Sequence, residues 1–122
     1  MKGKITIPYD MALSKNASHG YGQGNVYVKK ATQAAMDAIS YLIRPEFYGY
    51  RWTGEKIHVR IMVYRPDMRG DPINFQDCIC DAIKVGIGRD DNVYTSFTDW
   101  ELDKEHPRIE IEVEQGDEDG GA

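Results

Sequence analysis

Residues 69–91, RGDPINFQDCICDAIKVGIGRDD, combine a helical pattern with a concentration of acidic side chains. Apolar residues recur there at intervals of three and four, which predicts an amphipathic helix over about residues 73–85. Gly86 and Gly88 follow and allow a turn, so the chain can fold back toward its own helix. The expected core-facing stripe consists of Phe75, Ile79, Ala82 and Ile83.

The polar side chains of this segment are candidates for a metal site. Asp71 stands where a carboxylate can cap the first N–H groups of the helix, and Asp77 and Asp81 lie one turn apart on one surface. Hard cations such as Mg²⁺ prefer oxygen ligands and are held by one or two carboxylates, with water and phosphate completing the shell. The candidate oxygen ligands are Asp71, Asn74, Asp77, Asp81, Asp90 and Asp91.

The same residues also have a purely structural interpretation, which the spacing leaves open. Asp71 is then only a helix cap, and the acids along the helix belong to a solvated face. Residues 90–92 form an ordinary turn. The metal-site hypothesis therefore depends on Asp71 and Asp91, which are distant in sequence, meeting around one cation.

The residues on either side of this segment predict the strands of a sheet. Residues 56–65, KIHVRIMVYR, alternate strictly between apolar and other side chains and form the clearest strand of the chain. Weaker patterns predict further strands over residues 4–7, 25–28, 93–100 and 108–113.

A second helix is predicted over residues 29–43, and Pro45 stops it. Its expected core face consists of Ala31, Ala35, Ala38, Ile39, Leu42 and Ile43. Residues 8–24 are rich in Gly and small polar side chains and are expected to form a long mobile loop. The order of strands and helices predicts an α+β fold, in which two helices pack on one face of a mixed β-sheet.

Length and composition favour a single domain over residues 1–113, followed by an acidic, disordered tail at 114–122. The net charge of −5 argues against a simple nucleic-acid binder, but four of the 20 acids lie in this tail, and the other 16 nearly balance the 15 basic residues. We expect a cytoplasmic protein that does not enter membranes, because no long apolar run or secretory signal is evident. Cys78 and Cys80 cannot bridge each other on a helix and are predicted to be buried, reduced thiols.

Several motifs follow one another in a recognisable order. Residues 71–75 read DPINF, residues 81–82 read DA within the helix, and residues 90–91 read DD after a Gly turn. Near the N-terminus, residues 14–16 read SKN. This arrangement resembles the RusA family of Holliday-junction resolvases, which are small, homodimeric, Mg²⁺-dependent endodeoxyribonucleases often carried by prophages.

The resemblance implies a site and its partners. Asp71 and Asp91 correspond to metal ligands, with Asp90 and Asp77 as supplementary ligands or water-positioning bases, and Mn²⁺ as a substitute for Mg²⁺. Asn74 and Asp81 would support the site. A two-fold symmetric four-way DNA junction that needs two nicks implies a homodimer. The residues expected to contact DNA are Lys15, Asn16, Lys29, Lys30 and Arg69.

Two positions depart from the family pattern. Ile73 stands where the family has a second metal-binding Asp, and Asp77 stands where a basic residue is common. In the interpretation that we favour, Asp77 supplies the missing carboxylate from one helical turn further along. The alternatives are a catalytically silent DNA-binding protein on the same fold, and a nuclease that acts on other branched DNA.

Overall fold

The computed structural model describes residues 2–15, 19–22, 25–50, 56–88 and 94–115. With η denoting short 3-10 helices, its elements are β1 (Lys2–Pro8), η1 (Met11–Leu13), β2 (His19–Gly22), β3 (Asn25–Val28), α1 (Lys30–Ile43), η2 (Arg44–Phe47), β4 (Ile57–Arg65), η3 (Pro72–Phe75), α2 (Gln76–Ile87), β5 (Tyr94–Leu102) and β6 (Arg108–Gln115).

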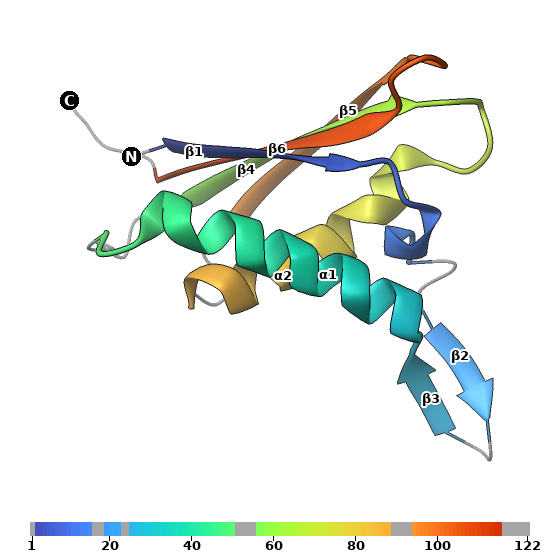
Figure 1. Cartoon of the computed structure of the whole chain (residues 1–122), viewed down its shortest axis with the longest axis horizontal. Helices are drawn as coiled ribbons and strands as arrows, with labels where there is room; N and C mark the ends of the chain where they lie inside the picture. The colour runs from blue at the N-terminus through green and yellow to red at the C-terminus, as the bar shows by residue number, and fades with distance from the viewer. Residues whose placement is uncertain (1, 16–18, 23–24, 51–55, 89–93, 116–122) are drawn as a thin grey trace.

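The main sheet has four strands in the order β1-β6-β4-β5. β4 and β5 are parallel, whereas β6 is antiparallel to both of its neighbours, β1 and β4. A parallel pair needs a crossover connection, and the chain between β4 and β5 supplies one that contains α2. Figure 1 shows α1 and α2 on the same side of the sheet, so the predicted α+β fold is confirmed.

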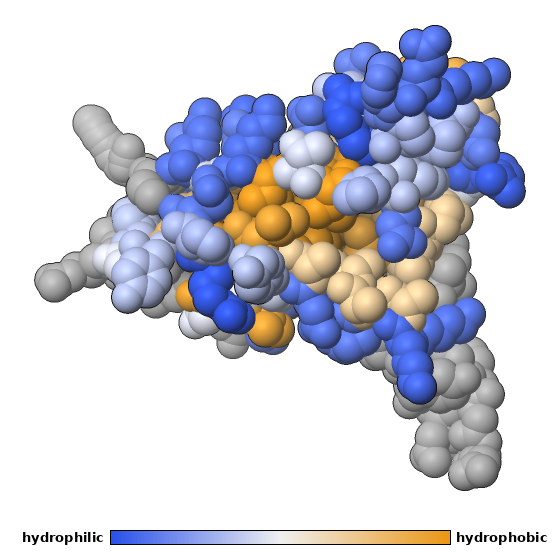
Figure 2. Space-filling model, in the orientation of Figure 1, coloured by the Kyte–Doolittle hydropathy of each residue, from blue (hydrophilic) through white to orange (hydrophobic). Residues whose placement is uncertain are grey.

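The core lies between the sheet and the two helices. Alternate positions of the central strands turn β-branched side chains toward the helices, and Ile57, Val59, Ile109 and Ile111 are fully buried there. Each such side chain stabilises the fold by about 1.5–3 kcal/mol. Figure 2 accordingly shows hydrophobic surface concentrated between the sheet and the helices, with hydrophilic surface around it. The predicted helix residues Phe75, Ile79, Ala82 and Ile83 are buried, as are both cysteines, Cys78 and Cys80.

The core-facing side of α1 differs from the predicted one. Ala31, Ala38 and Leu42 are exposed, whereas Thr32 and Ser40 are buried. Each hydroxyl compensates its burial by donating a hydrogen bond to a backbone carbonyl: Thr32 Oγ1 to Ala12 at 2.6 Å and Ser40 Oγ to Ala82 at 2.7 Å. A prediction from apolar residues alone therefore assigns the wrong buried face to α1, because these two hydroxyls can be buried once they are hydrogen-bonded.

α1 and α2 approach closely at Gly86. This glycine lies inside α2, which continues past the predicted end of the helix to Ile87 and is capped by Gly88 with φ 74°. A methyl group at Gly86 would overlap the side chain of Ile43 and lie 3.0 Å from the carbonyl oxygen of Ser40. The absence of a side chain at this point thus allows the two helices to pack together.

Residues 8–24 do not form the single long loop that was predicted. Asp10 caps η1 by accepting a hydrogen bond from the Ala12 amide at 2.9 Å, and Leu13 is fully buried. β2 and β3 then form an antiparallel hairpin, which Figure 1 shows projecting from the body beside the start of α1. Local capping and backbone pairing order a segment whose composition suggested mobility.

β6 also extends beyond its predicted end. It continues through Gln115, so the first two residues of the predicted tail belong to a strand. Gln115 is buried and its Oε1 accepts a hydrogen bond from the Tyr50 hydroxyl at 2.9 Å, which explains the longer strand. Residues 116–122 lie outside the described part of the chain.

Candidate functional site

Asp71 is presented by the connection between β4 and α2. Its Oδ1 accepts a hydrogen bond from the Ile73 amide at 3.2 Å, and its backbone carbonyl accepts one from the Asn74 amide at 3.0 Å. These bonds make Asp71 the N-cap of η3, as the sequence predicted. The side chain is exposed, and among the described residues its Oδ2 has no partner, so this oxygen can serve as a ligand.

A segment from the N-terminal part of the chain lies directly beside this cap. The Lys15 amide donates a hydrogen bond to the Asn74 carbonyl at 2.8 Å, and Ser14 lines one small hollow together with Asp71 and Arg69. The structure therefore brings together two of the motifs that were far apart in sequence.

The start of α1 is tied to the same region. The Thr32 hydroxyl holds the Ala12 carbonyl of η1, and η1 immediately precedes Ser14 and Lys15. Lys29 and Lys30, both exposed, begin α1 at this end. Two further predicted DNA contacts, Lys29 and Lys30, thus sit at the end of the molecule where Lys15 and Asn74 meet.

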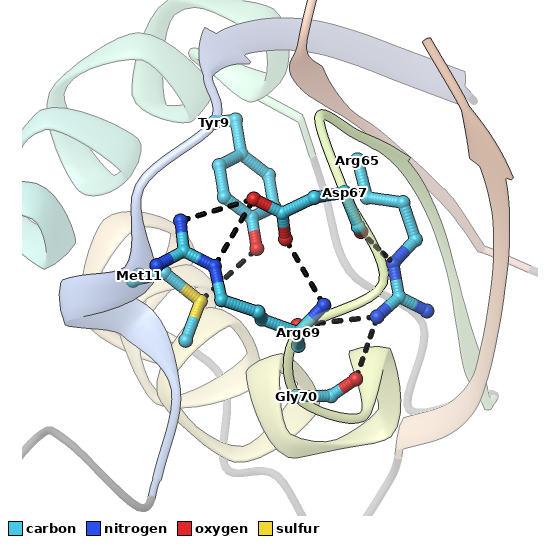
Figure 3. A network of polar contacts seen from close by, with 6 residues as sticks. All are labelled: Tyr9, Met11, Arg65, Asp67, Arg69 and Gly70. Carbon is cyan, nitrogen blue, oxygen red and sulfur yellow. Dashed lines mark hydrogen bonds and ion pairs between the residues drawn. The ribbon is translucent and has the colours of Figure 1, made fainter. Parts of the chain in front are cut away.

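Arg69 is oriented by an ion pair with Asp67 (Figure 3). Its Nη2 and Nε lie 3.0 Å and 3.1 Å from Asp67 Oδ2, and its backbone amide donates to Oδ1 at 3.0 Å. These hydrogen bonds hold the pKa of the Asp67 carboxyl below its usual value and raise the pKa of Arg69. Burial, followed by the nearby Asp67 charge, raises the pKa of the Tyr9 hydroxyl in the same cluster.

The acids of α2 lie on its solvent-exposed face. Asp77 is exposed in the first helical turn, where a negative charge interacts favourably with the helix dipole, and Asp81 is exposed one turn later. Asp81 is therefore not a buried structural residue. Ile73 is 50% exposed and faces solvent rather than the core.

The described residues contain no group of three His, Cys, Asp or Glu side chains that could hold a metal ion. Asp90, Asp91 and Asn16 lie outside the described residues, so the meeting of Asp71 with Asp91 stays a prediction. The exposed oxygen of Asp71 fits a Mg²⁺ ion that takes one or two protein carboxylates and keeps several waters.

Arg65, the last residue of β4, was not among the predicted site residues. Its side chain is 3% exposed and it contacts the backbone of the loop that carries Asp71. The signal was available, since Arg65 continues the inward-facing series Ile57, Val59, Ile61 and Val63 at alternate positions. A charge on the buried face of a strand needs partners, and here these are loop carbonyls.

A family model described as "Endodeoxyribonuclease RusA" matches residues 8–114 of the 122-residue chain. The chain belongs to the RusA endodeoxyribonuclease family. Membership confirms the resemblance and indicates a nuclease of the kind that resolves Holliday junctions. No curated protein matches the sequence significantly.

Within the described residues, none of the helices has the length and apolar character needed to cross a membrane.

Proposed function

We propose that this RusA-family protein is a Mg²⁺-dependent endonuclease that nicks four-way DNA junctions. The observation that carries the proposal is the hydrogen bond between the Lys15 amide and the Asn74 carbonyl. It joins the N-terminal SKN segment to the turn capped by Asp71, and Arg69 and Asp71 line the same small hollow. A phosphodiester can be bound and hydrolysed where cations and a metal-binding acid meet.

The residues divide between holding the metal and holding the DNA. Asp71 and Asp91 are the proposed ligands, with Asp77 and Asp90 as supplementary ligands or bases for the attacking water, and Asp81 in support. When bound, Mg²⁺ neutralises phosphate charge and lowers the pKa of a coordinated water. Asn74, in the η3 turn capped by Asp71, keeps that turn in register with the Lys15 segment.

The proposed DNA contacts are electrostatic. Lys15, Lys29, Lys30 and Arg69 would pair with phosphates on either side of the scissile bond, with Asn16 beside them. Such contacts release counterions, so junction affinity falls steeply with salt and depends little on base sequence. The two-fold symmetry of a four-way junction requires two sites, and we propose that a homodimer supplies them.

The first test is cleavage of a synthetic four-way junction in Mg²⁺ or Mn²⁺. The wild-type protein should introduce paired nicks, and Asp71→Asn should remove nicking while leaving junction binding intact. Asp37→Asn is the matched control, because Asp37 is an exposed acid on α1 that accepts a hydrogen bond only from Gln33 at 2.8 Å among the described residues. Full activity of Asp71→Asn would remove Asp71 from the site.

The exposed, apolar Ile73 favours a second candidate, a catalytically silent junction-binding protein. Mn²⁺ titration separates the two functions, because a silent protein binds junctions without measurable Mn²⁺ affinity. Asp77→Asn tests the compensation directly. If Asp77 replaces the family's second Asp, this variant loses nicking. A panel of flap, splayed and four-way substrates determines which branched DNA is cleaved fastest.

A further inference from the structure

Arg65 occupies an unusual position for a charged residue. It ends β4 on the face that packs against the helices, and it is 3% exposed. Its guanidinium donates three hydrogen bonds to backbone carbonyls of the following loop: Nε to Asp67 at 2.8 Å, and Nη2 to Arg69 at 3.1 Å and to Gly70 at 2.6 Å. Figure 3 shows the loop curled around this one side chain.

The other side of the guanidinium is covered by β5. Arg65 Cζ lies 4.7 Å from the centroid of the Trp100 ring, a distance at which a cation is attracted to the ring face. The backbone of Arg65 is fixed as well, because its carbonyl accepts a hydrogen bond from the Asp103 amide at 2.8 Å. Arg65 therefore connects two strands of the sheet to the loop.

Among the described residues no carboxylate forms an ion pair with Arg65. Its charge is met by carbonyl dipoles and by Trp100, and it also acts at longer range on the Asp67 carboxylate, whose pKa it helps to lower. A buried charge stabilises a fold poorly, and an apolar side chain of similar volume often does as well or better. What Arg65 adds beyond volume is geometry. A planar guanidinium fixes three carbonyls relative to one another, which neither a methionine nor a lysine can reproduce.

The loop held in this way leads directly into Asp71. Gly70 has φ 76°, a conformation that glycine adopts readily, and the bond from Arg65 fixes its carbonyl. On the other side, the amides of Ile73 and Asn74 bind the Asp71 side chain and carbonyl. Asp71 is thus anchored from both directions. We propose that Arg65 is the positioning residue of this site: it holds residues 66–70 so that Asp71 and Arg69 stand in their working orientation.

This inference rests on the proposed function, since it assigns Arg65 a role toward a ligand of that site. Arg65→Met keeps the volume and removes the hydrogen bonds. Arg108→Met is the matched control, because Arg108 also stacks on an aromatic ring but lies on β6, on the opposite face of the sheet from Arg65. Arg65→Lys retains the charge and serves as a second variant if Arg65→Met does not fold.

The experiment has two readouts besides activity. Hydrogen exchange at the amides of Ile73 and Asn74 reports whether the cap remains formed, and calorimetric titration reports Mn²⁺ affinity. In Arg65→Met both amides should exchange faster, and Mn²⁺ should bind about 10- to 100-fold more weakly, as when a ligand loses its supporting hydrogen bonds. Nicking should fall by roughly 100-fold, the effect of a small misplacement, with junction binding little changed.

The outcomes are distinguishable. If exchange and Mn²⁺ affinity in both Arg65 variants equal those of the wild type, Arg65 does not position Asp71 and the inference is overturned. If the wild type itself neither binds Mn²⁺ nor nicks junctions, the proposed function fails. In that case, unchanged exchange at Ile73 and Asn74 would overturn the positioning role as well, whereas faster exchange would show that Arg65 holds the loop.

Discussion

Arg65 and Arg108 sit near the same end of neighbouring strands and show two ways of placing a guanidinium. Arg65 is buried on the helix-facing side, over Trp100, and binds only carbonyls among the described residues. Arg108 lies on the opposite side of the sheet, 3.7 Å from the centroid of the Tyr64 ring. It forms ion pairs with Asp103 at 3.0 Å and Glu110 at 3.2 Å, and its side chain is 31% exposed.

The two arginines therefore have different roles: Arg65 positions a loop, whereas Arg108 forms ion pairs at the surface. The Arg108 pairs are open to water, where such pairs contribute little to stability and weaken with salt. Hydrogen bonds from the His106 amide and from Arg108 hold the Asp103 pKa below its usual value, and those to Asp103 and Glu110 raise the pKa of Arg108. Within the described part of the chain Arg65 forms no such ion pair, and its three hydrogen bonds converge on the loop that leads into Asp71. Its neighbourhood should therefore respond to mutation in function more than in stability.

The largest expected contrast lies between two glycines with the same backbone geometry. Gly70 has φ 76° and its carbonyl accepts a hydrogen bond from the Arg65 guanidinium, whereas Gly88 has φ 74° and caps α2. Alanine at either position should destabilise the fold by about 1–2 kcal/mol, because both need a left-handed conformation. Only Gly70→Ala should also weaken Mn²⁺ binding, by about 10-fold or more. Equal effects of both variants on Mn²⁺ affinity would show that Gly70 has no special role beside Asp71.

A smaller contrast is expected from the two aromatic rings. Trp100→Leu removes the ring over Arg65, and Tyr64→Leu removes the ring over Arg108. Each loses a cation–π interaction of about 0.5–2 kcal/mol, with the larger value at the more buried arginine. Nicking should drop several-fold in Trp100→Leu and stay unchanged in Tyr64→Leu. Junction cleavage rates and denaturant unfolding of both variants would measure the two effects side by side.

The smallest effect concerns the acids that pair with surface arginines. The pKa values of Asp67 and Asp103 both lie below the usual 3.8, so their contribution to stability is present above that pH and lost as the pH falls through the lowered values. Asp67→Asn and Asp103→Asn should each flatten the dependence of melting temperature on pH between about 4 and 2. A steeper dependence in either variant would contradict the assigned sign.

The same two variants, Asp67→Asn and Asp103→Asn, also test the role of Arg69. Asp67→Asn removes the charge that competes with phosphate for this guanidinium, so junction binding at low salt should tighten a few-fold. Asp103→Asn, beside Arg108, should leave junction binding unchanged. Fluorescence anisotropy with a labelled junction over a salt series provides the measurement, and tighter binding by both variants would indicate a general charge effect instead.

Periodic patterns allowed the sheet and α2 to be predicted, because alternate burial in β4 and the stripe of α2 are repeated many times. The face of α1 was predicted incorrectly, since Thr32 and Ser40 count as polar until their carbonyl partners are known. Asp71 was recognised because capping is local. Arg65 was not recognised, because its role depends on its contacts with the following loop and with Trp100. Trp100 reaches Arg65 only through the parallel pairing of β4 with β5.

The strand order has a consequence for how the enzyme is made. β6 follows the other three strands of the main sheet in sequence and inserts between β1 and β4, so the middle of the sheet is completed only after those three strands have been synthesised. Until then β1 has no neighbour, and the sheet cannot support the crossover that carries Asp71. Polypeptides that end before β6 should therefore be inert toward DNA, and nicking competence should arrive only once this strand has been added.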